Sequence, residues 1–390
     1  MNRKKINPLV FLALGLLVVC SCKKLIKPDP SSSPEQNFEM FWNDVNNTYP
    51  YFVEDGIDWK ARYEATRPTI SSSTSIEQLY SHITSMLKGF SDGHLSVDYP
   101  GNPGYPYQNE KANDEVLQLV RADQSGAPLT YVDPIAYYYD NFNAISKSYM
   151  DPFTYGVYTA PDVVNPLLQD TICMYGTMDN GNVLYVAILS FLTNAPLDVQ
   201  LEKIFTQRPY SQAKGMVLDL RMNGGGNLGI MWDAMGVFIP AGKGITEVKY
   251  AFNKQKVGPL PENFGVENYF SVPGNDGQQK YLKPVVVLTN RLTVSAAEHA
   301  TMAMRQIGKT AHPKIKIMGD YTFGATSFVV ERTLPNGITY TLVNSKTWDI
   351  NRVIVEKIGV KPDSLVYLTP VIQQNQDEQL EGAIQVIRND

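Results

Sequence analysis

The chain has 390 residues, of which 43% are hydrophobic and 19% are charged, and its formal net charge is −5. This length and composition predict a folded protein of two domains, or of one large domain with additions, that buries a sizeable core. The small negative charge gives no basic surface for nucleic acid, so we expect no nucleic-acid partner.

The N-terminus resembles that of a bacterial lipoprotein. A basic start leads into a short apolar run at residues 9–19, and then to Cys20 and Cys22. The run is too short to span a bilayer comfortably, which favours a signal peptide. Cys22 fits the lipidated position better than Cys20, which follows a bulky valine. We expect residues 1–22 to be a lipoprotein signal peptide ending at a lipobox and residues 23–34 to be a tether. Acylated Cys22 would hold the protein on a lipid membrane of the cell envelope, facing the periplasm or the cell surface.

After such processing, Cys173 is the remaining free thiol. A single cysteine excludes a disulfide framework, a zinc cluster of cysteines and a thiol redox pair. Its apolar surroundings in the sequence predict a buried core thiol rather than a nucleophile. Cysteine-based metal and cofactor sites are therefore not expected, and the mechanism considered below requires no metal and no cofactor.

Apolar residues repeat at helical spacing in the first part of the mature chain, which predicts a small helical domain at residues 35–99. Residues 100–175 form an irregular segment rich in Tyr and Pro, with weak alternation at 117–120 and 129–132 and a tyrosine-rich helical candidate at 135–145. The tyrosines are either packing residues or a peptide-binding surface.

Residues 176–390 alternate between strand and helix patterns, which predicts an α/β core with a mostly parallel sheet and an α+β chain overall. Strands are expected at residues 183–191, 216–220, 285–288, 314–318, 327–333, 338–343 and 366–368, and helices at residues 198–205, 230–239 and from Ser295 onward. Functional sites in such sheets lie at the carboxyl ends of the strands.

Two of these strand ends carry candidate chemistry. Three glycines, Gly224 to Gly226, follow one buried strand and would present backbone N–H groups to an anion. The motif lacks the endings of a phosphate loop, which leaves an oxyanion cradle or a flexible turn. Ser295 follows the other strand at the first turn of a helix, where it is either a cap or a nucleophile near free N–H groups.

A serine nucleophile requires a base, and the chain has four histidines. His82 and His312 are expected in solvated positions. His299 lies one turn after Ser295, whereas His94 lies in a turn after a helix, and local argument does not separate these two. Glu356 is the candidate third member, and its alternative is a surface ion pair with Lys357 or Lys361.

Four stretches together resemble the C-terminal processing (tail-specific) serine protease family: Val217 to Gly226, Thr293 to Glu298, Gly319 to Gly324, and Gly359 to Asp363. The resemblance covers roughly the last 210 residues well and the first 100 loosely. It implies a core of the ClpP/crotonase-like type, with Ser295 as nucleophile.

One residue departs from the tail-specific pattern, because Ala325 stands where that branch has its lysine base. The chain instead resembles the tricorn-like branch, which implies His94 as the base and Glu356 as its carboxylate partner. The peptide-binding PDZ domain common in the family is not recognisable between residues 100 and 171, so this segment is expected to be an atypical replacement.

The resulting hypothesis is a serine endopeptidase of the bacterial envelope that cleaves protein or peptide substrates through an acyl-enzyme. Ser295, His94 and Glu356 are its expected catalytic residues, and the N–H groups of Gly224, Gly225 and Ala296 are its expected oxyanion donors. The alternative is an inactive homologue that binds peptides or a partner protein, as the missing lysine suggests.

Overall fold

The computed structural model describes residues 33–100, 107–108, 134–242, 245–274, 277 and 279–390. The predicted signal peptide, Cys22 and most of the predicted tether lie outside these residues, and so do the two segments with weak alternation at 117–120 and 129–132. Within the described ranges, no helix is long and apolar enough to cross a membrane.

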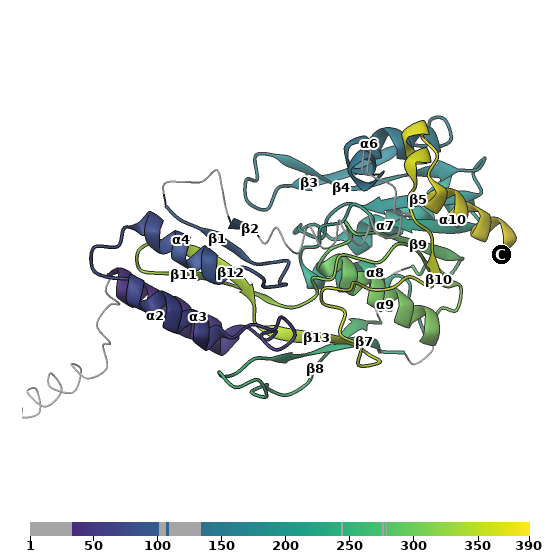
Figure 1. The fold of residues 1–390 in the computed structure, drawn as a ribbon. Helices are drawn as coiled ribbons and strands as arrows, with labels where there is room; N and C mark the ends of the chain where they lie inside the picture. The colour runs from purple at the N-terminus through teal and green to yellow at the C-terminus, as the bar shows by residue number, and fades with distance from the viewer. Residues whose placement is uncertain (1–32, 101–106, 109–133, 243–244, 275–276, 278) are drawn as a thin grey trace, which may run out of the picture.

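A seven-stranded sheet forms the centre of the larger unit (Figure 1). Its order is β14-β10-β9-β6-β5-β4-β3; β14 to β5 pair in parallel, whereas β4 and β3 are antiparallel additions at one edge. The bounds are β3 Gly156–Pro161, β4 Gln169–Met178, β5 Val183–Ile188, β6 Gly215–Asp219, β9 Val285–Thr289, β10 Ile315–Gly319 and β14 Ser364–Leu365. The predicted α/β core with a mostly parallel sheet is therefore confirmed.

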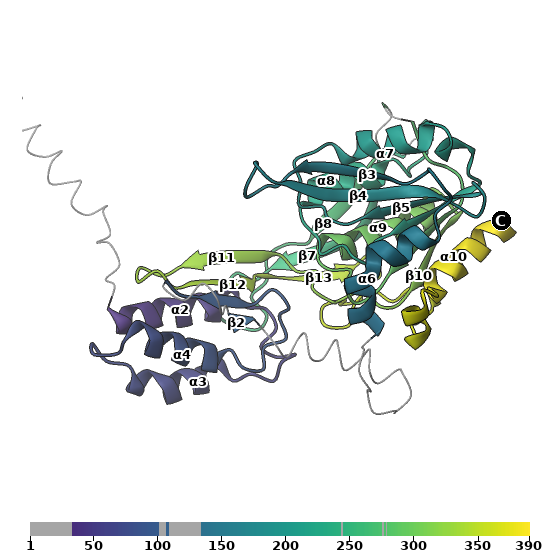
Figure 2. The same cartoon turned by 90° about the horizontal axis from the view of Figure 1, so that it is seen from above.

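Helices cover both faces of this sheet (Figure 2). Alternate residues of the buried strands point to opposite faces, as strand geometry requires. Leu184 and Val287 pack in one apolar cluster with α7 Leu197–Thr206, α8 Leu228–Gly236 and α9 Ala296–Thr310. Tyr185 and Leu288 pack in the other with α6 Pro134–Ser148 and α10 Glu378–Asn389. Two short 3-10 helices, η2 Tyr210–Gln212 and η3 Pro370–Gln374, complete these layers.

The N-terminal unit is helical as predicted, and its helices begin at capping residues. Ser33 accepts a hydrogen bond from Gln36 N, Asp58 accepts one from Ala61 N, and Ser75 forms a capping box. The elements are α2 Pro34–Thr48, α3 Trp59–Thr66, η1 Arg67–Thr69 and α4 Ile76–Met86. Their apolar faces pack together in a second hydrophobic core.

A hairpin from the C-terminal half completes that second core. β11 Val329–Thr333 and β12 Thr339–Val343 pair with β1 Ser96–Asp98 and β2 Tyr107–Gln108 in the order β11-β12-β1-β2. Leu334, Tyr340 and Leu342 pack against the N-terminal helices. A three-stranded sheet of β13 Ser345–Asp349, β7 Glu247–Gln255 and β8 Asn268–Pro273 lies between the two units.

Three sequence expectations differ from this fold. The helical candidate at residues 135–145 is confirmed as α6, but the segment expected to be irregular also contains β3 and most of β4, so the boundary expected at residue 176 falls inside β4. Residues 366–368 are not a strand, because the pairing with β10 takes place two residues earlier, at Ser364–Leu365. The strands expected at residues 327–333 and 338–343 form as β11 and β12, but they belong to the sheet of the N-terminal unit.

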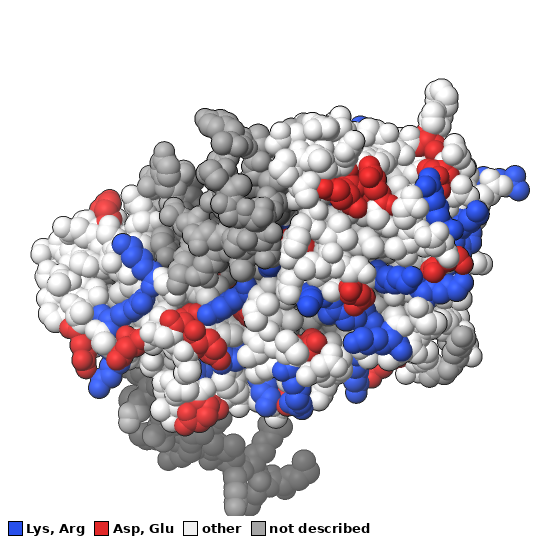
Figure 3. All heavy atoms as spheres, turned by 45° about the vertical axis from the view of Figure 1, so that its right-hand side comes forward, with Lys and Arg blue, Asp and Glu red and all other residues white. Residues whose placement is uncertain are grey.

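Charged side chains are interspersed on the face shown in Figure 3, where Lys and Arg lie among Asp and Glu. Among the described residues, some charged side chains form partly exposed ion pairs, such as Arg305 with Asp363 and Lys316 with Asp390. Pairs of this kind contribute little to stability.

Candidate active site

Three neighbouring parallel strands, β6, β9 and β10, have their carboxyl ends at the same edge of the sheet. β6 leads into the glycine loop, β9 leads into the Ser295 turn, and β10 leads into residues 320–327. The side chains at this edge therefore come from segments far apart in sequence but adjacent in register, as expected for an α/β site.

Ser295 is half-buried at the N-terminus of α9, and its backbone is unusual. Its φ and ψ angles are 56° and −118°, a combination that non-glycine residues rarely adopt. Thr293 fixes the turn before it, because its hydroxyl donates to Leu220 O (2.9 Å) and accepts from Asn290 N (3.1 Å). A serine on a strained turn between a strand and a helix is the local geometry of a nucleophile.

Glu298 holds this turn against the segment that follows β10. The buried carboxylate accepts four hydrogen bonds, from Ser295 N at 3.0 Å, Thr322 Oγ1 at 2.6 Å, Gly324 N at 2.7 Å and Ala325 N at 2.7 Å. Burial raises the pKa of Glu298 to about 6, and these donors act in the opposite direction. The sequence had indicated Glu298 only as an acidic position, and its bridging role emerges from the fold.

The glycine loop packs directly against Ser295. A Cβ added to Gly225 would lie 2.7 Å from Ser295 Cβ, and one added to Gly226 would lie 2.1 Å from Leu192 N. Both glycines have positive φ angles, 103° and 132°. Side chains are therefore excluded at these two positions for steric and conformational reasons.

The expected set of oxyanion donors needs one correction. The N–H of Gly225 donates to Asn223 Oδ1 at 2.9 Å, so it is not available to a ligand. Within the described part of the chain, the N–H groups of Gly224 and Ala296 make no protein hydrogen bond and remain open. Asn223, which sequence reasoning had not singled out, is buried and also donates to Ile188 O at 3.1 Å.

His94 lies in a loop that β12 anchors. Asp92 is buried and accepts hydrogen bonds from His94 N (2.7 Å) and Val343 N (2.8 Å). A Cβ on Gly93 would lie 2.6 Å from the Phe323 ring and 3.3 Å from the Ala325 side chain. The loop therefore packs on the position where the tail-specific branch has its lysine, which leaves little room for a long side chain there.

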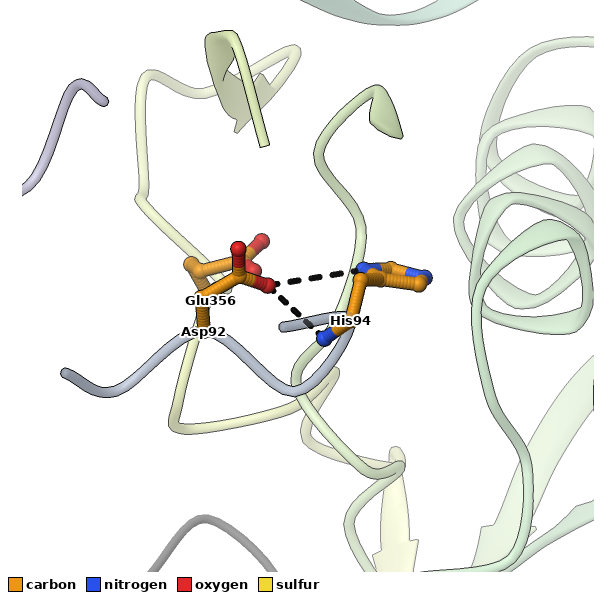
Figure 4. A group of neighbouring side chains, drawn as sticks. All are labelled: Asp92, His94 and Glu356. Carbon is orange, nitrogen blue, oxygen red and sulfur yellow. Dashed lines mark hydrogen bonds and ion pairs between the residues drawn. The ribbon is translucent and has the colours of Figure 1, made fainter. Parts of the chain in front are cut away.

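Asp92, His94 and Glu356 form a tight cluster (Figure 4), with one potential ligand atom from each lying within 4.8 Å of the others. Asp92 Oδ1 is 3.9 Å from His94 Nδ1. Neither His94 Nδ1 nor Glu356 Oε1 has a hydrogen-bond partner among the described residues. Side chains of these types can also bind a transition metal. Sequence reasoning had used Asp92 only as part of the histidine motif and missed it as a second acid.

Burial governs the charges of this cluster. It raises the pKa of Glu356 to about 8, helped by the nearby Asp92 charge, and it raises the pKa of Asp92 to about 7. Burial and the neighbouring His299 lower the pKa of His94 to about 4. The two carboxyl groups therefore carry less than two negative charges at neutral pH, and His94 is a neutral imidazole that can accept a proton.

Glu356 is a buried residue rather than half of a surface ion pair. Its Oε2 accepts hydrogen bonds from both the N–H and the hydroxyl groups of Thr326 and Ser327, at 2.9 to 3.1 Å. Lys357, its sequence neighbour, pairs with Asp55 of the N-terminal unit instead. The ion pairs weighed for Glu356 on sequence alone are thus not formed.

The His299 side chain is buried, and both of its ring nitrogens have hydrogen-bond partners. Its Nδ1 lies 3.1 Å from the Tyr250 hydroxyl, which itself accepts from Trp232 Nε1, and its Nε2 lies 2.9 Å from Thr326 O. Both ring nitrogens are used, so His94 is the better candidate for the base. His312, expected in solvent, is also buried.

No hydrogen bond joins Ser295 Oγ to His94 within the described residues; such contacts are often loose without substrate.

Comparisons with known proteins show which families and structures the chain is similar to. Residues 182–366, just under half of the chain, match the model of peptidase family S41. The carboxy-terminal processing protease CtpA of Bacillus subtilis (strain 168) is 27% identical over 197 residues, which cover 50% of this chain and 38% of that protein. The chloroplastic C-terminal processing peptidase of Tetradesmus obliquus is 29% identical over 211 residues, which cover 53% of this chain and 39% of that protein. The matches thus span less than half the length of these curated relatives.

The fold of nearly the whole chain also has a counterpart among solved structures. A crystal structure from Parabacteroides merdae ATCC 43184 superimposes with a TM-score of 0.69 at 22% identity, covering 92% of this chain and 97% of that one. This similarity concerns the fold alone, and it extends to the N-terminal unit that the family model does not reach.

Proposed function

We propose that the chain is a member of peptidase family S41 and a serine endopeptidase that cleaves protein or peptide substrates through an acyl-enzyme, a proposal that the family match over just under half of the chain supports. The observation that carries this proposal is the backbone of Ser295, held at φ 56° at the head of α9 with the glycine loop packed against its Cβ. Strain of this kind persists where the surrounding contacts impose it, and the contacts of Ser295 with the glycine loop and Glu298 therefore support its assignment as the nucleophile.

In the proposed mechanism, Ser295 Oγ attacks the scissile carbonyl and His94 accepts its proton. His94 Nδ1 faces the buried carboxyl groups, which leaves Nε2 on the opposite side of the ring for the serine (Figure 4). The same nitrogen then returns the proton to the leaving amine. Water hydrolyses the acyl-enzyme by the same proton transfers in a second half-reaction.

The oxyanion of the tetrahedral intermediate would be held by backbone donors. The N–H groups of Gly224 and Ala296 flank Ser295, and the N-terminal end of α9 adds its positive dipole. Asn223 contributes indirectly, because it fixes the loop through Gly225 N and Val294 N. Glu356 and Asp92 would orient the imidazole and stabilise its charged form.

The location proposed for the enzyme is the bacterial cell envelope, with acylated Cys22 as a lipid anchor. The support is the basic start, short apolar run and cysteine of the N-terminal sequence. The described part of the chain begins at Ser33 and enters α2 at once, so the folded units would follow a short tether.

A fluorophosphonate probe with intact-mass detection tests the nucleophile. We expect one probe per wild-type molecule, none on Ser295→Ala, and unchanged labelling of Ser71→Ala, which removes an exposed serine far from the site. Cleavage of an unfolded protein substrate should fall by at least roughly 10⁴-fold in Ser295→Ala and in His94→Gln. Labelling of Ser295→Ala at the wild-type level would refute the assignment.

The same experiment tests the alternative function, in which the protein is an inactive homologue that binds peptides without cleaving them. The absence of a Ser295 to His94 hydrogen bond among the described residues is the observation that favours this alternative. A wild-type protein that neither reacts with the probe nor cleaves, but binds unfolded peptides in a fluorescence-anisotropy titration, would support it.

A further inference from the structure

Tyr51 of the N-terminal unit reaches the pocket that holds Glu356. The side chain is 1% exposed, and its hydroxyl lies 2.8 Å from Ser327 Oγ, although the two residues are 276 positions apart in sequence. Ser327 in turn contacts Glu356 Oε2 through both its N–H and its hydroxyl group. Tyr51 is therefore one hydrogen bond removed from the acid of the proposed triad.

The direction of these hydrogen bonds follows from the number of protons. A serine hydroxyl has a single proton, and Ser327 donates it to Glu356 Oε2 at 2.9 Å. The remaining contact then requires Tyr51 to be the donor and Ser327 Oγ to be the acceptor. The result is a chain from Tyr51 to Ser327 to Glu356, in which each bond polarises the next and strengthens it.

We propose that Tyr51 is a positioning residue for the proposed triad. Tyr51 acts on Glu356 through Ser327, so that the orientation of the Glu356 carboxyl group depends on the docked N-terminal unit. The inference rests on the proposed peptidase function. Tyr51 touches no reacting atom in this scheme. It fixes the rotamer of Ser327, and it increases the ability of Ser327 to stabilise the Glu356 carboxylate.

The electrostatic surroundings set the sign of the expected effect. The titratable groups that face Glu356 are Asp92 and His94 from the loop before β1, Glu298 from α9, and Tyr51 itself. Asp92 and Glu298 both oppose ionisation of Glu356. The donors from residues 326 and 327 favour ionisation, so removing the Tyr51 hydroxyl should raise the pKa of Glu356 further.

The test is Tyr51→Phe, with Tyr340→Phe as a matched control. Tyr340 is also buried in the second hydrophobic core, but its hydroxyl donates to Asp44 at 2.8 Å, away from the triad. We expect roughly tenfold lower kcat for Tyr51→Phe, KM within twofold of wild type, and an acid limb of the kcat/KM profile displaced to higher pH. Tyr340→Phe should retain the wild-type kcat and pH profile.

A double-mutant cycle tests the route through Ser327. In the Ser327→Ala background, Tyr51→Phe should have little further effect on kcat, because the hydrogen-bonded route from Tyr51 to Glu356 that the described residues show is already broken. An equal kcat loss in both backgrounds, an unchanged Tyr51→Phe enzyme, or the same kcat loss in Tyr340→Phe would each overturn the inference.

A titration of the Glu356 carboxyl group in an inactive variant tests the positioning role independently of the proposed peptidase activity. In the Ser295→Ala protein with ¹³C-labelled glutamate carboxyls, the Glu356 signal can be assigned by its loss in Glu356→Gln. Tyr51→Phe should raise the pKa at which this signal titrates, and an unchanged titration would refute the positioning role. A wild-type protein without turnover or probe labelling would instead refute the proposed function.

Discussion

The ion pair between Lys357 and Asp55 joins the two units next to the candidate site, and breaking it should reveal how far the site depends on their docking. The Asp55 side chain is 1% exposed and also accepts hydrogen bonds from Tyr49 OH (2.5 Å) and Ser91 N (3.2 Å). Ser91 begins the His94 loop, and Lys357 directly follows Glu356. One carboxylate therefore contacts the segments that carry the proposed base and the proposed acid.

Replacing Lys357 by Met would leave the Asp55 carboxylate buried without its cation. Removing one partner of a fully buried pair costs about 3–5 kcal/mol. Because the Lys357 side chain is 28% exposed, solvent screening reduces the expected loss to about 1–3 kcal/mol. Lys357→Arg keeps the charge and should recover most of this loss. The activity should fall through kcat, since the pair touches the His94 loop and the Glu356 segment.

Urea unfolding and steady-state cleavage measure these effects, and Lys316→Met is the matched control. Lys316 is 49% exposed and lies 3.6 Å from Asp390, so its loss should change the free energy of unfolding by less than about 0.5 kcal/mol. Asp55→Asn should show a coupling energy with Lys357→Met in a double-mutant cycle. Equal effects of Lys357→Met and Lys316→Met, with no such coupling, would refute the reasoning.

Three further outcomes follow from residues near the site. Glu298→Gln should cost about 2–4 kcal/mol in urea unfolding, because an amide cannot accept from all four donors; a neutral result would contradict the role assigned to this carboxylate. Gly226→Ala should lose about 3 kcal/mol or more, given its φ angle and the 2.1 Å approach of Leu192 N, and a near-native melting temperature would be the contrary result. Burial raises the pKa of Glu356 to about 8, so the folded protein retains a proton that the unfolded chain has lost. Glu356 should therefore contribute a decrease in the free energy of unfolding from about pH 4.5 to about pH 8, of at most about 1.4 kcal/mol per pH unit, and Glu356→Gln should remove this contribution.

The core strands and the serine turn could be predicted because local patterns determine them. A continuous apolar run such as residues 285–288 favours a strand covered on both faces, and the small residues after Ser295 favour a helix. The partners of a strand are less visible in sequence. Residues 339–343 alternate as a strand should, but alternation does not indicate which sheet they join, and the structure places them beside β1.

The candidate site was predictable in its residue types but not in its hydrogen bonds. His94 and His299 were indistinguishable by local argument, and the fold separates them because both nitrogens of His299 are occupied. The N–H of Gly225 looked available until the Asn223 side chain was placed. Asp92 is a similar case. The sequence shows that an acidic residue precedes His94, but the position of its carboxylate next to the His94 ring depends on the hydrogen bond from Val343 of β12.

The hairpin β11–β12 also constrains the order in which the chain folds during synthesis. The helices of the N-terminal unit leave the ribosome first, but their core needs Tyr340 and Leu342, and β1 needs its partner across 245 residues of sequence. Contacts this distant in sequence form slowly, because the whole intervening loop must close first. A nascent chain that ends before residue 343 lacks the strand that anchors the His94 loop, so the proposed triad cannot assemble before the α/β core is almost completely translated.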